Sequence, residues 1–190
     1  MRRGLIVAIA LLAAGCGGAP GADSPELAVK RFLDTWEDWG QDFDSGDRRE
    51  FYARNCRLVD PAIRRGALFD EEEGYSDGNC GAGVVVAVAY TGDSGEMEDP
   101  SRISGDVVSA RTEGDRAVVT VRMRYAARPG PYPPPPASAT VKVLAVRRDG
   151  AWWVATPLAF NPLKARDGGM SEAELERDHR ESLARAEERD

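Results

Sequence analysis

Apolar residues in the N-terminal part of the chain recur at helical spacing. Ser24-Pro25-Glu26 is typical of a helix start, with serine as the N-cap, proline at the first helical position and an acid in the first turn. Apolar positions then follow every three or four residues as far as Phe43, which predicts a long amphipathic helix. Asp47 and Glu50 resemble a capping box for a second helix, and residues 59–66 predict a further short helical turn.

The pattern then changes to that of β-strands. Residues 84–90 are rich in β-branched side chains and predict a strand. Residues 103–112 and 116–127 predict a hairpin around a Glu-Gly-Asp turn, and residues 140–148 and 151–156 predict a second hairpin around an Asp-Gly turn. The organisation is therefore α+β, with the helices first and the strands after them.

Apolar and polar side chains alternate within residues 116–127, so one face of this strand is predicted to be buried. Arg122 and Arg124 fall on the other face and are predicted to point to solvent. The proline-rich residues 128–136 cannot join a sheet ladder, so they predict a polyproline-like connection between the two hairpins.

Residues 161–190 form a charged tail. Ser171 and Glu174 resemble a capping box, which predicts a helix from about Ser171 onward. The apolar residues of this helix are sparse, namely Leu175 and Leu183 with His179 between them. We therefore expect a helix that is solvated or only weakly docked on the domain.

Composition narrows the functional classes. The net charge of -7 argues against a general nucleic-acid-binding protein, which would carry a basic surplus. A hydrophobic content of 42% is sufficient for a packed core. The single histidine lies in the charged tail, which argues against a Ser-His-Asp triad, a His-Asp pair or a histidine-based metal site. We expect no metal and no cofactor.

The first residues have the composition of an export signal. Arg2 and Arg3 precede an apolar run at residues 5–14, which is as long as a signal-peptide core and too short to span a bilayer. The small residues directly before Cys16 resemble a bacterial lipobox, although Ala13 stands where leucine is commonest.

The lipobox resemblance implies a lipoprotein signal peptide at residues 1–15, cleavage after Gly15 and a lipid on the sulfur of Cys16. Its acyl chains, such as palmitate, would anchor the chain stably in a membrane. Residues 16–23 are small and polar and predict a flexible tether. The expected location is the extracytoplasmic face of the cell membrane, within the cell envelope.

Two further cysteines, Cys56 and Cys80, are predicted to form a disulfide because the exported chain lies in an oxidising compartment. The bond would close a loop of about 24 residues and contribute roughly 3 kcal/mol. A metal or redox pair is disfavoured because the chain has no Cys-x-x-Cys spacing. The acidic residues 70–77 inside this loop lack the EF-hand pattern, so a solvated loop is expected.

The order of long helix, second helix, strand and two hairpins resembles the NTF2-like fold, which includes SnoaL-like and ketosteroid-isomerase-like proteins. The matching stretches are residues 28–32, Cys56, residues 114–119 and residues 149–154. The resemblance implies a domain at residues 24–160. In this fold the helices pack on a curved antiparallel sheet of about five strands and form a cone.

Four aromatic residues are candidates for lining a cavity in the cone or a partner surface: Trp36, Tyr125, Trp152 and Trp153. Adjacent residues of a strand point to opposite faces, so Trp152 and Trp153 are expected to diverge. One would pack on the first helix, and the other would lie on the outer face or at the mouth of the cone. The alternative is that the tryptophans simply fill the core.

We expect a non-catalytic binding or interaction module with a protein partner. One alternative is a carrier of a small apolar ligand in the cone. Another is a histidine-independent isomerase or dehydratase with groups drawn from Tyr52, Tyr90, Tyr125 and Asp106, none of which is selected by spacing. Proteins of this fold often form homodimers through the open sheet face, which the outward-facing arginines disfavour.

Overall fold

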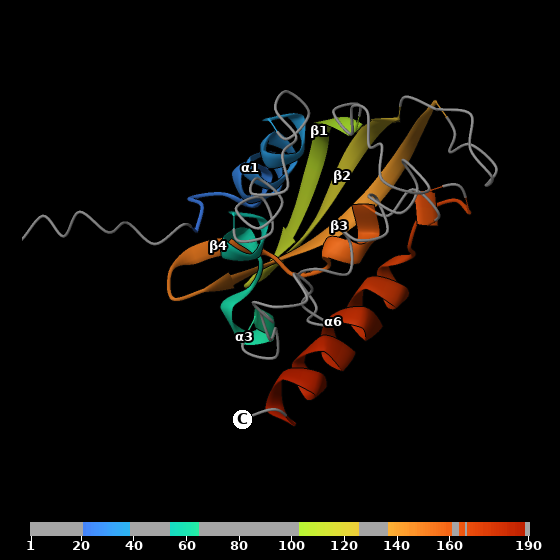
Figure 1. Ribbon diagram of the computed structural model, residues 1–190. Coiled ribbons are helices and arrows are strands. Elements are labelled where there is room, and N and C mark those ends of the chain that lie inside the picture. Colours follow the sequence, from blue (N-terminus) through green and yellow to red (C-terminus); the bar gives the residue numbers. More distant parts are fainter. Residues whose placement is uncertain are drawn as a thin grey trace, which may run out of the picture.

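The computed structural model describes residues 21–38, 54–64, 103–125, 137–160, 164–165 and 167–188. These residues form a mixed α+β structure (Figure 1). Its elements are α1 (Pro25–Asp38), α3 (Pro61–Arg64), β1 (Ile103–Glu113), β2 (Arg116–Tyr125), β3 (Ser138–Arg148), β4 (Ala151–Val154), the 3-10 helix η1 (Pro157–Phe160) and α6 (Glu172–Glu187). The predicted strand at residues 84–90 and the proline-rich connection lie outside the described residues. None of the described helices is both long and apolar enough to cross a membrane.

The four described strands form one antiparallel sheet in the order β1-β2-β3-β4, and both predicted hairpins are confirmed. Asp149 and Gly150 both have positive φ, 51° and 82°, as the tight turn between β3 and β4 requires. The predicted alternation in β2 is also confirmed. Ala117, Val119, Val121 and Met123 are buried, whereas Arg122 and Arg124 are exposed.

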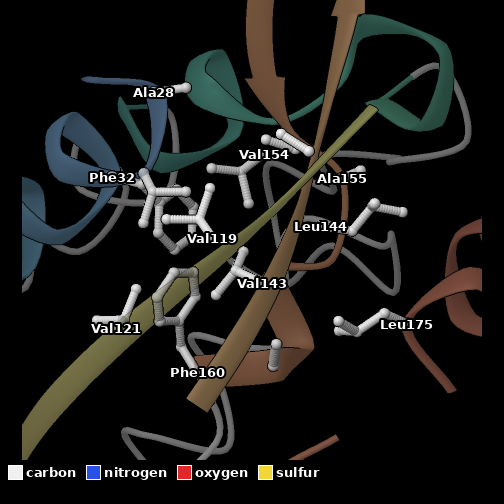
Figure 2. Packing of buried hydrophobic residues seen from close by; sticks show 14 of the residues in the cluster. Ala28, Phe32, Val119, Val121, Val143, Leu144, Val154, Ala155, Phe160 and Leu175 are labelled. Atoms are coloured by element: carbon white, nitrogen blue, oxygen red, sulfur yellow. The ribbon is translucent and has the colours of Figure 1, made fainter. Parts of the chain in front are cut away.

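Helix α1 packs on the apolar face of the sheet and begins as predicted. The Ser24 hydroxyl accepts a hydrogen bond of 3.2 Å from the Leu27 backbone N–H. Phe32 is fully buried and stacks on Phe160 of η1, with ring centroids 5.1 Å apart (Figure 2). Gly105 permits the close approach of α1 to β1, because a Cβ there would lie 3.2 Å from the Leu33 Cδ2 atom.

Helix α6 lies on the opposite side of the sheet from α1 (Figure 1). Its start is the predicted capping box: the Glu174 N–H donates to the Ser171 hydroxyl, and the Glu174 carboxylate accepts from the Ser171 N–H. Beneath it, Leu144 and Val146 of β3 are buried on the face that points away from α1. β3 is consequently covered on both sides.

The expectation of a solvated or weakly docked tail helix is wrong. One stripe of α6 is buried, and it consists of Leu175, His179, Ser182 and Ala186. The stripe is only half apolar, so its hydrophobic signal in the sequence is weak. At the N-terminal end of the helix, Glu172 pairs with Lys142 at 2.9 Å and with Arg111, and Glu176 pairs with Arg116.

Substitution of Gly105 by alanine should destabilise the protein. The new methyl group would lie 2.9 Å from the Met123 sulfur and 3.2 Å from Val121 Cγ1, so the buried side chains packed against it must shift. We expect a loss of about 1–3 kcal/mol in the free energy of unfolding, measured by urea denaturation. The exposed Ser109→Ala variant on the same strand is the control. Equal unfolding midpoints for the two variants would contradict the close packing at Gly105.

Candidate functional site

The most unusual group in the described part of the chain is the carboxylate of Asp60, which has no solvent exposure. Asp60 caps α3, with Pro61 at the first helical position, and its Oδ1 accepts a 3.0 Å hydrogen bond from the Ala62 N–H. The backbone N–H of Asp60 donates to the Val154 carbonyl at 2.9 Å. This bond, beside the parallel bridge between Val59 and Val154, fixes Asp60 against the edge of β4.

Two side chains from distant parts of the sequence converge on this carboxylate. Arg148, at the end of β3, donates from Nε to Oδ1 at 2.7 Å and from Nη2 to Oδ2 at 2.9 Å. His179, on α6, places Nε2 at 3.1 Å from Oδ2. With the Ala62 N–H, each oxygen of Asp60 has two hydrogen-bond partners. We call Asp60, Arg148 and His179 the buried triad after its two buried members, Asp60 and His179; the Arg148 side chain is 39% exposed.

The electrostatics of the buried triad favour an ionised Asp60. Burial alone would raise the pKa of this carboxyl, but hydrogen bonds from His179, Arg148 and the Ala62 N–H outweigh it and hold the pKa well below its usual range. The hydrogen bond that Arg148 makes with Asp60 in turn raises the pKa of Arg148. The arginine therefore balances the charge of Asp60, and the bidentate geometry makes the pair strong.

His179 is 2% exposed, and its Nε2–H donates to the ionised carboxylate. Its other ring nitrogen, Nδ1, is enclosed and has no hydrogen-bond partner among the described residues. A general base must reach its substrate, whereas Nδ1 faces the protein interior in this arrangement. The triad thus fits a structural tie between α3, the end of β3 and α6.

The prediction that His179 lies on a solvated or weakly docked tail helix is wrong. α6 folds back on the domain and brings the histidine to Asp60, which is 119 positions earlier in the chain. The relevant signal in the sequence is the 4-3-4 spacing of Leu175, His179, Ser182 and Ala186, which defines one helical face. The Asp60-Pro61 pair is also a helix-start signal, and it explains the predicted short turn at residues 59–66.

The structure places two of the four candidate aromatic residues in the interior. Trp152 is 7% exposed and joins the hydrophobic core, and Trp153 is 5% exposed. The Trp153 indole N–H donates to the Arg148 carbonyl at 3.3 Å, and the Arg64 guanidinium lies 5.1 Å above its ring. Neither tryptophan is therefore an exposed contact on the outer face. The side chains of Trp36 and Tyr125 lie outside the described part of the chain.

Of the three cysteines, the structure describes only Cys56. Cys56 lies in a helical segment at residues 54–58 and is disulfide-bonded. Its partner lies outside the described residues, so the pairing with Cys80 stays a prediction. Cys16, the predicted lipidation site, also lies outside them. In the described ranges, no three His, Cys, Asp or Glu side chains are grouped as metal ligands would be.

A second feature is a groove of about 280 Å³ between α6 and strands β1 and β2. Its apolar lining includes Val118, Ala173 and Leu144 of β3. Its walls carry both signs of charge, contributed by Arg111, Arg116, Glu113, Glu172 and Glu176. The lining thus has two arginines against three glutamates, and because both arginines pair with glutamates of α6, it offers no basic surplus that would select an anion.

Removal of the His179 ring should loosen α6. His179→Ala deletes one hydrogen bond and leaves a cavity while preserving the Asp60–Arg148 pair, so we expect a loss of about 2–4 kcal/mol in the free energy of unfolding. Urea denaturation measures this loss. Arg180→Ala, an exposed neighbour on the same helix, should change stability by less than about 0.5 kcal/mol. Faster proteolysis within α6 of the His179→Ala variant should accompany the loss, and an unchanged proteolytic rate would contradict the tie.

The lowered pKa of Asp60 predicts a loss of stability in acid. An aspartate in the unfolded chain titrates near about pH 3.9, so the folded state binds fewer protons than the unfolded state in the range below that value. The contribution of Asp60 is therefore full above about pH 5 and declines as the pH falls through 3.9 toward the lower folded pKa. In urea denaturation at several pH values, the stability difference between wild type and Asp60→Asn should shrink with acidification. A difference that stays constant between about pH 7 and pH 3 would contradict the assignment.

Comparison with known proteins gives no relative for this chain. No protein-family model, curated protein or solved structure matches it. The structure shows the mixed α+β arrangement with a four-stranded antiparallel sheet, and the NTF2-like cone stays a prediction.

Proposed function

We propose that the chain is a membrane-anchored extracytoplasmic lipoprotein whose NTF2-like domain is a non-catalytic binding or interaction module. We propose that this module binds its partner through its outer surface, and the observation that supports this is the stack of Phe32 on Phe160, which fills the interior. The two rings lie 5.1 Å apart at an interplanar angle of 22°, and both side chains have no solvent exposure. They occupy the space between α1 and the sheet, where a ligand of an NTF2-like cone would lie.

A carrier of a small apolar ligand is the nearest alternative. It would need an open apolar cavity in this interior. Around the two rings, Val119, Val121 and Val143 have no solvent exposure and fill the same layer (Figure 2). This packing favours recognition through the outer surface over binding inside the cone.

A histidine-independent isomerase is less well supported. Its general base would need a carboxyl that burial raises to a higher pKa. Asp106 is exposed, and a hydrogen bond from Arg124 lowers its pKa. Tyr52 and Tyr90 lie outside the described residues, and so does the side chain of Tyr125. Asp106, the catalytic candidate whose side chain the structure describes, therefore forms a surface ion pair with Arg124.

The outer surface is mainly polar where the structure describes it. Val108 is the one large hydrophobic residue recorded there as exposed, at 52%. A homodimer through the outer face of the sheet would have to displace α6 or bury Arg122 and Arg124. A partner protein would accordingly meet a charged surface in which hydrogen bonds and ion pairs set the specificity.

The anchor is tested by Cys16→Ser expressed with its own signal sequence in a bacterial host. The wild-type protein should fractionate with membranes, and its intact mass should begin at a lipid-modified Cys16. Cys16→Ser should lack the lipid and leave the membrane fraction, whereas the matched tether variant Gly18→Ser should behave as wild type. Membrane retention of an unlipidated Cys16→Ser chain, with its signal sequence removed, would overturn the lipoprotein proposal.

The released chain also tests the binding mode. Native mass spectrometry should give the bare polypeptide mass if the interior is filled by its own side chains. A non-covalent adduct that denaturation removes would favour the carrier instead. Phe160→Ala serves as the comparison, because opening the ring stack should create space in which an added apolar probe such as benzene can bind.

A further inference from the structure

Two arginines stand side by side on the strand side of the groove between α6 and strands β1 and β2. Arg111 of β1 lies directly across from Val118 of β2, and Arg116 lies two positions before Val118 on the same strand. Residues in this diagonal relation point to the same face of the sheet and lie about 7–8 Å apart. Their guanidinium groups therefore flank Val118, and we call Arg111 and Arg116 the arginine pair.

The helix side of the groove carries two carboxylates. Glu172 and Glu176 are four residues apart on α6, so they are neighbours on one helix face, with Cβ atoms about 5–6 Å apart. Ala173, which also lines the groove, adds only a methyl group beside them. We call Glu172 and Glu176 the glutamate pair, and it faces the arginine pair across the groove.

The lining and the groups that pair with it carry equal charge of both signs. Glu113 lies on the strand side and pairs with Arg111 at 2.9 Å, and Lys142 of β3 pairs with Glu172 at 2.9 Å. The charged groups are then three of each sign: Arg111, Arg116 and Lys142 against Glu113, Glu172 and Glu176. A net anion or a net cation is not favoured by this balance, whereas a molecule that carries both charges can present each one to the pair of opposite sign.

The two ion pairs that cross the groove can be replaced at low cost. Arg111 pairs with Glu172 and Arg116 with Glu176, and these four side chains are between 32% and 58% exposed. Ion pairs in contact with water contribute little net energy. A bound carboxylate can therefore take the place of the glutamates at the arginine pair, and a bound ammonium group can take the place of the arginines at the glutamate pair.

The remainder of the lining is apolar and the space is small. Leu144 of β3 lies directly across from Val118, and both contribute to the lining together with Ala173. The volume of about 280 Å³ lies just below the range of about 300–1,000 Å³ that is usual for drug-sized ligands. A ligand that fits this groove is therefore a small molecule with a short apolar group next to its two charges.

We propose that the groove binds a free α-amino acid with an aliphatic side chain. The arginine pair binds the carboxylate, the glutamate pair binds the ammonium group, and the apolar lining contacts the side chain. Arginine suits this role because its planar guanidinium donates parallel hydrogen bonds to both oxygens of a carboxylate. The proposal adds a small-molecule ligand to the outer surface of the proposed binding module. It does not depend on the lipid anchor, because every lining residue belongs to the folded domain.

The test is a titration of the full chain with leucine, leucinamide and N-acetylleucine, followed by two-dimensional amide NMR in buffer or, where the chain carries a lipid, in neutral detergent. Leucine should bind saturably and shift the amide signals of Val118 and Ala173. Leucinamide lacks the carboxylate and N-acetylleucine lacks the ammonium group. Each should bind at least about tenfold more weakly, as expected for the loss of one charged hydrogen-bonding group. No saturable shift with leucine, or equal affinity for the three compounds, would overturn the proposal.

A charge exchange separates binding from structure. Arg116→Glu combined with Glu176→Arg keeps an ion pair across the groove but removes the separation of charge between its two sides. The unfolding midpoint in urea should stay near that of wild type, whereas the affinity for leucine should fall at least about tenfold. The matched control is Lys30→Asp combined with Asp34→Lys, which exchanges an exposed ion pair on α1 and should leave both quantities unchanged.

Unchanged affinity for leucine in the groove exchange variant would overturn the assignment of the carboxylate and the ammonium group to the two pairs. The comparison of the three compounds on the wild-type chain needs no variant, so it decides the proposal even if the exchange lowers stability. Failure of leucine to bind would leave the lipid anchor standing, because membrane fractionation of Cys16→Ser tests the anchor separately.

Discussion

A carboxylate with no solvent exposure is costly unless its oxygen atoms are fully hydrogen-bonded, and Asp60 meets this demand with donors from three parts of the chain. The Ala62 N–H belongs to its own helix, Arg148 ends β3, and His179 comes from α6. Removal of any one donor leaves a buried charge partly unsatisfied. The position of α6 therefore depends on the same interaction that fixes α3 beside β4.

β4 is the element on which these constraints meet. It is only four residues long, and β3 pairs with one of its edges. Two residues outside the named strands also pair with β4, since Ala22 pairs with Trp152 and Val59 pairs with Val154. The Trp153 indole N–H adds a hydrogen bond to the Arg148 backbone carbonyl across the β3–β4 turn. The entry of the chain, the cap of α3 and the contact with α6 are thereby coupled through one short strand.

The sequence predicts the local structure well because each local signal has a local cause. Ser24 and Ser171 each cap a helix by accepting a hydrogen bond from a backbone N–H three residues later in the sequence. The alternation in β2 follows directly from the geometry of a strand. The buried triad has no such signal. Its pairing of Asp60 with His179 depends on how α6 docks, and the buried stripe of α6 contains a serine and an alanine in place of large apolar residues. A histidine in a charged segment therefore resembles a solvated residue until the tertiary structure supplies its partner.

The burial of Trp152 and Trp153 shows a related limit of sequence reasoning. Alternation correctly separates adjacent side chains of a strand, but it does not say whether the second face is covered. Here Gly21 and Arg64 cover Trp153, and both come from segments far from β4 in the sequence. A glycine at position 21 is needed because any side chain there would collide with Ala151 Cβ, which would lie 2.4 Å away. Gly21 is thus fitted to the tryptophan beneath it, and a contact between two segments distant in sequence decides that the second face of β4 is covered.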